Sequence, residues 1–198
     1  MEFYGPIESF FKSPEKPPSP EGDSILFHLR VDLERLYGKE DEFNTKPSAH
    51  IMLSMMGMLA GMDYLSKIYS GKESGDGFVE MATKLGKLDK DNAEALYQLR
   101  CALVHSVSLS TICKRKHYRK GTNFIFQIND KPPHILLEKL SDKSREVKYS
   151  ISFYGLKKCF TSIINALFEI CNNLSHPKNR YMLSSICKYS EEKILKEL

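Results

Sequence analysis

Apolar residues recur at the three-to-four-residue spacing of an α-helix in six stretches of the chain. Capping and breaking residues mark the first stretch, with Asp23 or Ser24 before it and Gly38 after it. The second stretch has a Met-rich face that we expect to be core: Met52, Met55, Met56, Leu59, Met62 and Leu65. The predicted helices cover about residues 24–37, 48–69, 75–86, 89–107, 153–171 and 180–198.

Between the fourth and fifth helices the pattern changes to short segments typical of β-strands. These segments are "NFIFQI", "HILLEKL" and "VKYSISF", separated by turn-forming and charged residues. We predict that residues 121–153 form an inserted β-hairpin or small sheet. The fold class is therefore mainly α, a helical bundle with a β insert. We expect a single domain over residues 1–198, whose N-terminal arm with a Pro-rich loop covers residues 1–23.

The composition is that of a soluble globular protein, with 41% hydrophobic and 27% charged residues among 198. The longest apolar run, residues 51–62, is shorter than the roughly 20 residues that span a bilayer, so we predict no membrane partner. The five cysteines follow no secretory signal, which predicts free thiols and a cytoplasmic location. The net charge of +4 permits an RNA partner without requiring one.

One stretch, "EALYQLRCALVHSVSLS", places an arginine and a histidine at the end of an apolar helix. His105 has a side chain whose ordinary pKa lies near neutrality, so it can give or take a proton. Arg100 is always charged and matches a phosphate bidentately. Five residues separate the two, which places them roughly 140° apart around an ideal helix. Convergence requires a distorted helix end, a long reach of the arginine, or a second subunit.

The segment "LRCALVHS" resembles the signature of the HEPN superfamily (higher eukaryote and prokaryote nucleotide-binding), an arginine and a histidine with four to six residues between them. The matching residues are Arg100 and His105 at the end of a helix, and "MMGMLAGMDYLSKI" is similar to the Met-rich early helix of bacterial members. The resemblance covers about residues 24–110 and 153–197.

The resemblance implies a HEPN-like helical bundle that forms a homodimer and cleaves RNA without a metal. The 2′-OH would attack the adjacent phosphate, leaving a cyclic phosphate and a 5′-OH. Arg100 would bind the phosphate and His105 would transfer a proton. The implied biological role is that of a toxin or defence effector, with an antitoxin or another protein as a further partner.

Cys101 departs from the family pattern, because many active members have Asn or Asp directly after the arginine. A second interpretation is therefore a non-catalytic HEPN-like dimer that binds a nucleotide or a protein. A third is structural: Arg100 makes a surface or interface salt bridge, and His105 lies near a helix C-terminus, where a positive charge is favoured.

A basic run follows the motif directly. It could hold an RNA backbone, with its tyrosine stacking on a base. The alternative is a solvated loop that precedes the β insert. The RNA-binding candidates are Lys114, Arg115, Lys116, Tyr118, Arg119 and Lys120.

One acidic residue, Asp63, interrupts the otherwise apolar second helix. It could contact Arg100 across the bundle. By analogy with the family, we expect it to be a supporting acid, and capping or solvation explains the other acidic residues near helix starts.

Zinc binding is a further alternative, because Cys101 and His105 together with Cys113 and His117 supply four ligands that zinc accepts. The paired C-x2-C spacing of structural zinc sites is missing, so our leading interpretation includes no metal. The sequence also lacks a P-loop, a Rossmann fingerprint and a G-x-S-x-G elbow. We therefore predict no cofactor.

Overall fold

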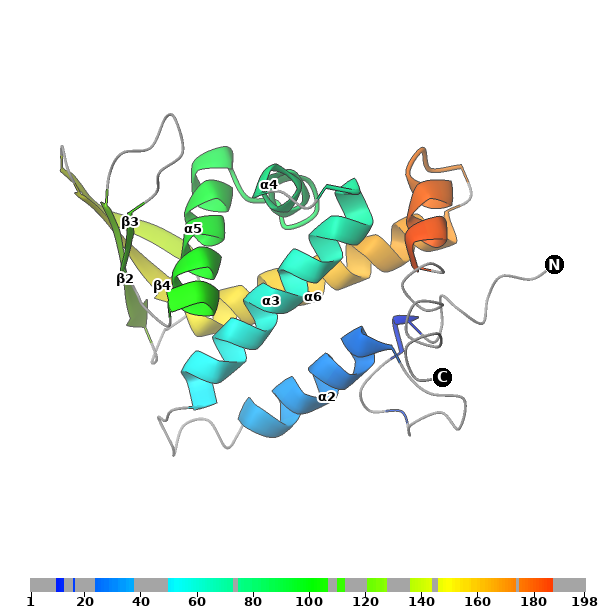
Figure 1. Ribbon diagram of the computed structural model, residues 1–198, viewed down its shortest axis with the longest axis horizontal. Helices are drawn as coiled ribbons and strands as arrows, with labels where there is room; N and C mark the ends of the chain where they lie inside the picture. The colour runs from blue at the N-terminus through cyan, green and yellow to red at the C-terminus, as the bar shows by residue number, and fades with distance from the viewer. Residues whose placement is uncertain are drawn as a thin grey trace.

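The computed structural model describes residues 10–12, 16, 24–37, 50–72, 75–106, 110–112, 121–127, 136–143, 146–173 and 175–186. This part of the chain is mainly α with one small sheet, as predicted (Figure 1). In chain order the elements are α2 (Ile25–Tyr37), α3 (His50–Ser70), α4 (Gly75–Lys84), α5 (Lys90–Ser106), β1 (Ser110–Ile112), β2 (Gly121–Gln127), β3 (Leu137–Lys143), β4 (Glu146–Ser152) and α6 (Phe153–Asn172). A last helical segment covers residues 179–186.

Helix α3 lies at the centre of the bundle, because α2, α4, α5 and α6 all pack against it (Figure 1). The predicted Met-rich face is confirmed as core, with four of its side chains fully buried: Met55, Leu59, Met62 and Leu65. Met58, which the prediction did not name, is fully buried beside them. Met52 and Met56 are partly buried and pack against the edge of this core. On the side facing α2, a Cβ on Gly61 would lie 2.6 Å from Leu29 Cδ2, so glycine allows the two helices to approach closely.

The β insert is a four-stranded sheet with strand order β1-β2-β4-β3. Strands β3 and β4 form an antiparallel hairpin, whereas β2 pairs with β4 in parallel, with Phe124 opposite Tyr149. The sheet is thus wider than the predicted residues 121–153, because β1 precedes them and pairs antiparallel with β2. Strand β1 has only three residues, too few to show a period-two pattern.

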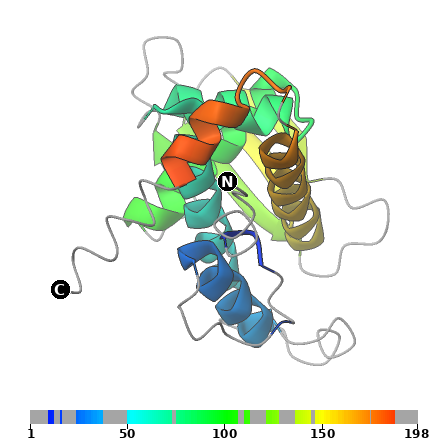
Figure 2. The same cartoon turned by 90° about the vertical axis from the view of Figure 1, so that its right-hand side faces the viewer.

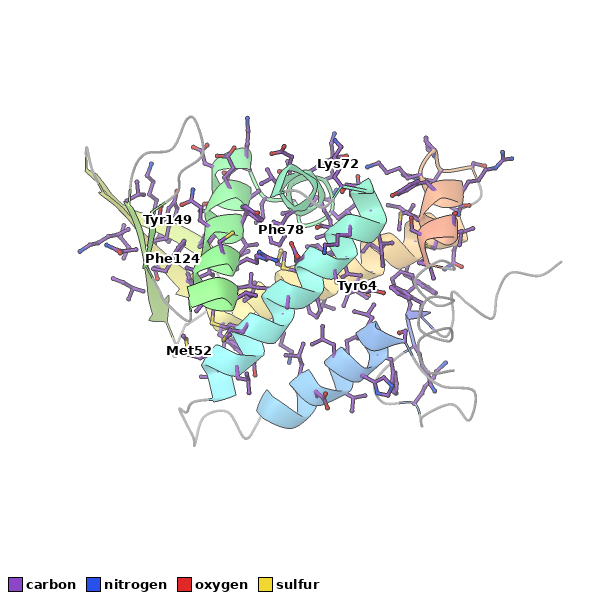
Figure 3. All side chains as sticks on the ribbon, in the orientation of Figure 1. Met52, Tyr64, Lys72, Phe78, Phe124 and Tyr149 are labelled. Atoms are coloured by element: carbon purple, nitrogen blue, oxygen red, sulfur yellow. The ribbon has the colours of Figure 1, made fainter. Side chains whose placement is uncertain are left out.

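Helix α5 packs beside the sheet, and α6 begins at the end of β4 and runs away from the sheet behind α3 (Figure 1). Alternate side chains of β2 and β4 point into this interface, where the rings of Phe124 and Tyr149 stack 6.0 Å apart (Figure 3). A buried hydrogen bond crosses it, in which Thr122 Oγ1 donates to Gln98 Oε1 at 2.5 Å. Because both partners are buried, losing either would leave a polar group unsatisfied, so this contact fixes α5 on β2.

Side-chain caps set the helix starts. The Ser24 hydroxyl accepts a hydrogen bond from Phe27 N at 3.1 Å, and Asp89 Oδ1 accepts one from Asn92 N at 2.9 Å. Ser24 was one of the two predicted caps of its helix, and each of the two residues satisfies a backbone donor that has no partner within its own helix. Ser152 caps α6 in the same way by accepting from Gly155 N.

The helical segment over residues 179–186 follows α6, and Figure 2 looks onto the bundle from the side where it lies. The predicted helix over 180–198 is confirmed as far as residue 186, and its remainder lies outside the described residues. The buried Asn179 donates through Nδ2 to the carbonyls of Ile170 and Cys171, at 3.0 and 2.7 Å. These bonds satisfy carbonyls at the end of α6 and fix the turn between the two helices.

An ion pair joins this turn to the rest of the bundle. Lys178 Nζ lies 2.8 Å from Glu80 Oε1 of α4 and 3.5 Å from the ring centroid of Tyr69 at the end of α3. The hydrogen bond from Lys178 lowers the pKa of Glu80. Partial burial by itself would lower the pKa of Lys178, but hydrogen bonds with Glu80 and Tyr69 outweigh it and raise the pKa.

Gly155→Ala tests the junction between the sheet and α6. A Cβ at this position would lie 2.6 Å from Leu136 Cα and 2.8 Å from Leu136 N, and backbone atoms cannot move aside cheaply. We expect a loss of about 1–3 kcal/mol in the free energy of unfolding, measured by urea titration. The matched control Ser162→Ala, at an exposed position of α6, should change it by less than about 0.5 kcal/mol. Equal stability of the two variants would contradict the close approach.

Candidate functional site

Arg100 lies on the flank of α5 that faces α3. Its Nη2 donates to Asp63 Oδ2 at 2.8 Å, so the expected contact across the bundle is present. The two side chains are 15% and 20% exposed, respectively. Because both side chains are largely buried, this ion pair is shielded from solvent more than a surface salt bridge. Both side chains are still exposed enough to contact a molecule bound at the surface.

Partly open apolar side chains lie on the same two helices as this ion pair. On α3 they are Leu53, Met56 and Ala60, which we call the α3 stripe; Leu53 is 52% exposed and Met56 half-buried. On α5, Cys101 and Val104 are half-buried. The residues of the α3 stripe recur at three- and four-residue intervals and therefore lie on one side of the helix, about one turn (Ala60), two turns (Met56) and three turns (Leu53) before Asp63.

The position of His105 is set by the regularity of α5. The helix continues without interruption to Ser106, so a distorted helix end does not bring positions 100 and 105 together. Arg100 faces α3, whereas Gln98 faces β2. Position 105 lies roughly 140° around the helix axis from Arg100 and within about 20° of Gln98, on the flank nearer the sheet. The side chain of His105 is outside the described part of the structure.

The six basic-run candidates, Lys114, Arg115, Lys116, Tyr118, Arg119 and Lys120, also lie outside the described residues. The strands on either side fix where this run begins and ends, because Ile112 of β1 is paired with Gly121 of β2. The run therefore connects two adjacent strand ends at one end of the sheet. Strand β1 also packs on α5, so the connection starts close to the helix that bears Arg100.

The zinc alternative involves residues that the structure describes only in part. Cys101 is a half-buried free thiol on α5, while Cys113 and His117 fall outside the described ranges. Within those ranges, no three His, Cys, Asp or Glu side chains are grouped as metal ligands.

The buried thiols of α6 are poor nucleophiles. Burial raises the pKa of Cys159 to about 11 and that of Cys171 to about 12, so both are neutral thiols at physiological pH. Both are free, as predicted, and so is Cys101. Of these three, only Cys101 is accessible enough to touch a ligand near Arg100.

Sequence reasoning found Arg100 and Asp63 but missed the α3 stripe beside them. A signal was present in the spacing of Leu53, Met56 and Ala60, but Met56 was assigned to the Met-rich core face, whereas the structure leaves it only partly buried. The ion pair of Lys178 and Glu80 had no such signal, because 98 positions separate its partners.

Comparisons of the chain with models of known protein families, with curated proteins and with solved structures find no match. No helix in the described ranges is both long and apolar enough to cross a membrane. The motif and the geometry around Arg100 are therefore what indicate a function.

A double-mutant cycle tests the ion pair. Asp63→Asn, Arg100→Gln and the double variant should give a coupling free energy of about 1–2 kcal/mol in urea unfolding, because the pair is largely screened from water. The same cycle on Lys90 and Glu94 is the control, since that α5 pair is 4.0 Å apart and Lys90 is 79% exposed. Its coupling should stay below about 0.5 kcal/mol, and equal values in the two cycles would refute a special role for the inner pair.

Proposed function

We propose that the protein is a metal-independent ribonuclease of HEPN type that works as a homodimer. The observation that supports this most is the Arg100 guanidinium, held by Asp63 at a partly open surface on the helix that also contains His105. An arginine that is fixed in place loses less freedom when it binds a phosphate, so its positive charge is available to the transition state at lower cost.

The residue chemistry fits cleavage by the RNA's own 2′-OH. A bond forms between O2′ and phosphorus while the bond from phosphorus to O5′ breaks, and the proton lost from O2′ is matched by one gained at O5′. Arg100 stabilises the extra charge on the phosphoryl oxygens, and His105 transfers a proton. The products are a cyclic phosphate and a 5′-OH.

The positions of the two motif residues in one chain support the proposed homodimer. Positions 100 and 105 lie on different flanks of a regular α5, and Asp63 holds Arg100 on the flank facing α3. A second copy supplies another Arg100 and His105, so the arginine of one copy can meet the histidine of the other. Two histidines can then act as base and acid in one reaction.

The basic run over residues 114–120 guides the RNA strand toward this surface, with Tyr118 stacking on a base. The net charge of +4 favours a polyanionic substrate. A ribonuclease that needs no metal is harmful unless controlled, which fits a cytoplasmic toxin or defence effector that is restrained by an antitoxin or another protein.

A non-catalytic HEPN-like dimer that binds a nucleotide or protein is the second candidate. Two observations favour it. Asp63 already accepts a hydrogen bond from Nη2 of the Arg100 guanidinium. Cys101 also stands where many active family members have a polar residue. Such a dimer would use Arg100 to recognise an anionic group without any transfer of protons.

Cleavage of end-labelled RNA in excess EDTA decides between these functions. The parent protein should yield products ending in a cyclic phosphate. His105→Ala should lower the rate by about 10²–10⁴-fold and Arg100→Ala by about 10²–10³-fold. His28→Ala is the matched control, because His28 is an exposed histidine on α2, and it should cleave like the parent.

No cleavage by a folded, dimeric parent protein would favour the binding module. Equal cleavage by the parent and by His105→Ala would reveal a contaminant or another site. Cleavage that EDTA abolishes would restore the zinc alternative.

Asp63→Asn tests the supporting acid. The amide keeps the shape but holds Arg100 less firmly, so kcat should fall about tenfold while RNA binds as well as before or better, because one negative charge is gone. Glu94→Gln is the control, since it removes the same charge from a pair on α5 that is 4.0 Å apart and whose lysine is 79% exposed. A parallel fall in kcat for both variants would indicate a general charge effect and contradict a positioning role for Asp63.

A further inference from the structure

One strip of α3 stays open between α2 on one side and α4 and α5 on the other (Figure 1). Its residues recur at intervals of three and four, and their positions fall within about 100° of one another around the helix axis. None of the six is buried: Leu53, Met56, Ala60, Asp63, Lys67 and Ser70. We call this set of residues the open strip.

The chemistry of the open strip changes at Asp63. Before this residue the strip is the apolar α3 stripe, and after it come Lys67 and Ser70. Lys67 follows Asp63 by four residues, so its Cα lies about 6 Å further along the helix. Lys67 is half-buried, because its aliphatic chain lies along the protein surface while its ammonium is directed to water. Arg100 reaches over from α5 to Asp63, where the apolar and polar halves of the strip meet.

Positive charge exceeds negative charge at this point of the open strip. An acid four residues before a lysine on a helix is well placed for an ion pair, but the carboxylate of Asp63 is bound to Arg100 Nη2 at 2.8 Å. Lys67 forms no ion pair within the described part of the chain. Two cations thus share one carboxylate, which leaves a net charge of +1. Because the surface around it is partly shielded from water, this charge attracts an anion more strongly than a fully exposed one.

The end of α3 provides a second explanation for a lysine at position 67. Lys67 lies in the last turn, where the unpaired carbonyls of the helix favour a positive charge. That effect stabilises the fold and requires no ligand. A neutral replacement separates the two explanations, because only an anion site loses affinity for a ligand.

We propose that the open strip binds a single strand of RNA, with the reacting phosphate at Arg100 and a neighbouring phosphate at Lys67. The Lys67 ammonium is a compact charge on a flexible stem, which suits a phosphate that is held and does not react. A base of the strand lies on the α3 stripe and covers its apolar side chains. This inference rests on the proposed function for the role of Arg100, and it adds a substrate class and a positioning residue.

The width of the open strip favours an unpaired strand. It is one helix wide and is bounded by packed helices on both sides. Apolar side chains contact the face of a base only where that base is splayed out of a double helix. Duplex RNA is instead recognised mainly by its shape, through contacts to the sugars and phosphates across its wide minor groove. We therefore expect loops and unpaired stretches to be bound in preference to duplex RNA.

Binding of a strand that cannot be cleaved tests the proposal without relying on catalysis. A fluorescent single strand of 2′-fluoro RNA lacks the attacking hydroxyl but keeps the phosphates. Lys67→Gln should weaken its binding about three- to tenfold and lower the slope of log K against log salt concentration by about 0.7, the value for one phosphate contact. Lys158→Gln is the matched control, because Lys158 is an exposed lysine of α6, and it should change neither quantity.

A second variant tests the base contact. Leu53→Ser removes a 52% exposed apolar side chain from the α3 stripe, so it should weaken binding while leaving the salt slope unchanged. An unchanged affinity of this variant would contradict the base contact.

Several outcomes would overturn the proposal. One is an affinity and a salt slope of Lys67→Gln equal to those of the parent protein, and a loss of stability alone would then assign Lys67 to the helix end. Another is the absence of binding by the parent protein. Equal affinity for the single strand and for a duplex of the same length would refute the substrate class.

Cleavage of ordinary RNA by the same preparations separates this inference from the ribonuclease proposal. Lys67→Gln should raise KM with little change in kcat, because Lys67 holds the strand away from the reacting phosphate. Cleavage without any effect of Lys67→Gln on strand binding would remove only the inference. Binding that depends on Lys67 without cleavage would remove the ribonuclease and leave a strand-binding module.

Discussion

The burial of α3 is the constraint on which the rest of the structure depends. Four other helices pack around it, so its fully buried methionines and leucines fix the positions of α2, α4, α5 and α6 together. Gly57 and Gly61 let α2 approach closely on one side. A helix surrounded in this way has only a narrow strip left for solvent. In α3 that strip contains the α3 stripe and, at its edge, the carboxylate of Asp63. The site around Arg100 is thus located at the rim of the core, where charge can be both held and reached.

Local chemistry explains why the helices could be predicted from the sequence. Ser24 and Asp89 cap helices within three residues of themselves, and the apolar repeat of α3 specifies its buried face without reference to distant residues. The sheet could be predicted from the sequence only in part. Its hairpin, β3–β4, was visible as neighbouring β-rich segments, but the parallel pairing of β2 with β4 places β4 between β2 and β3. Local patterns do not encode that order, because it depends on pairing between strands that are not neighbours in the sequence.

The candidate site likewise has features that could be predicted from the sequence, whereas an ion pair elsewhere in the bundle could not. The contact of Asp63 with Arg100 was predictable because each charge interrupts an apolar helix and a partly buried ion requires a partner. The separation of Arg100 from position 105 followed from helix geometry alone and persists because α5 stays regular to Ser106. The pairing of Lys178 with Glu80 and Tyr69 could not be predicted, since it depends on the turn after α6, which places Lys178 next to α3 and α4.

The N-terminal segment Phe10–Lys12 and the ion pair of Arg100 meet on one stretch of α3. Tyr64, whose ring centroid lies 6.3 Å from that of Phe10, directly follows Asp63, which holds Arg100. Adjacent helical residues point roughly 100° apart, so the N-terminal segment lies on one side of the open strip and α5 lies on the other. Both neighbours are held by specific contacts, because Ser24 Oγ donates to the carbonyl of Phe10 and Arg100 donates to Asp63. The open strip beside Arg100 is therefore bounded on both sides by fixed elements.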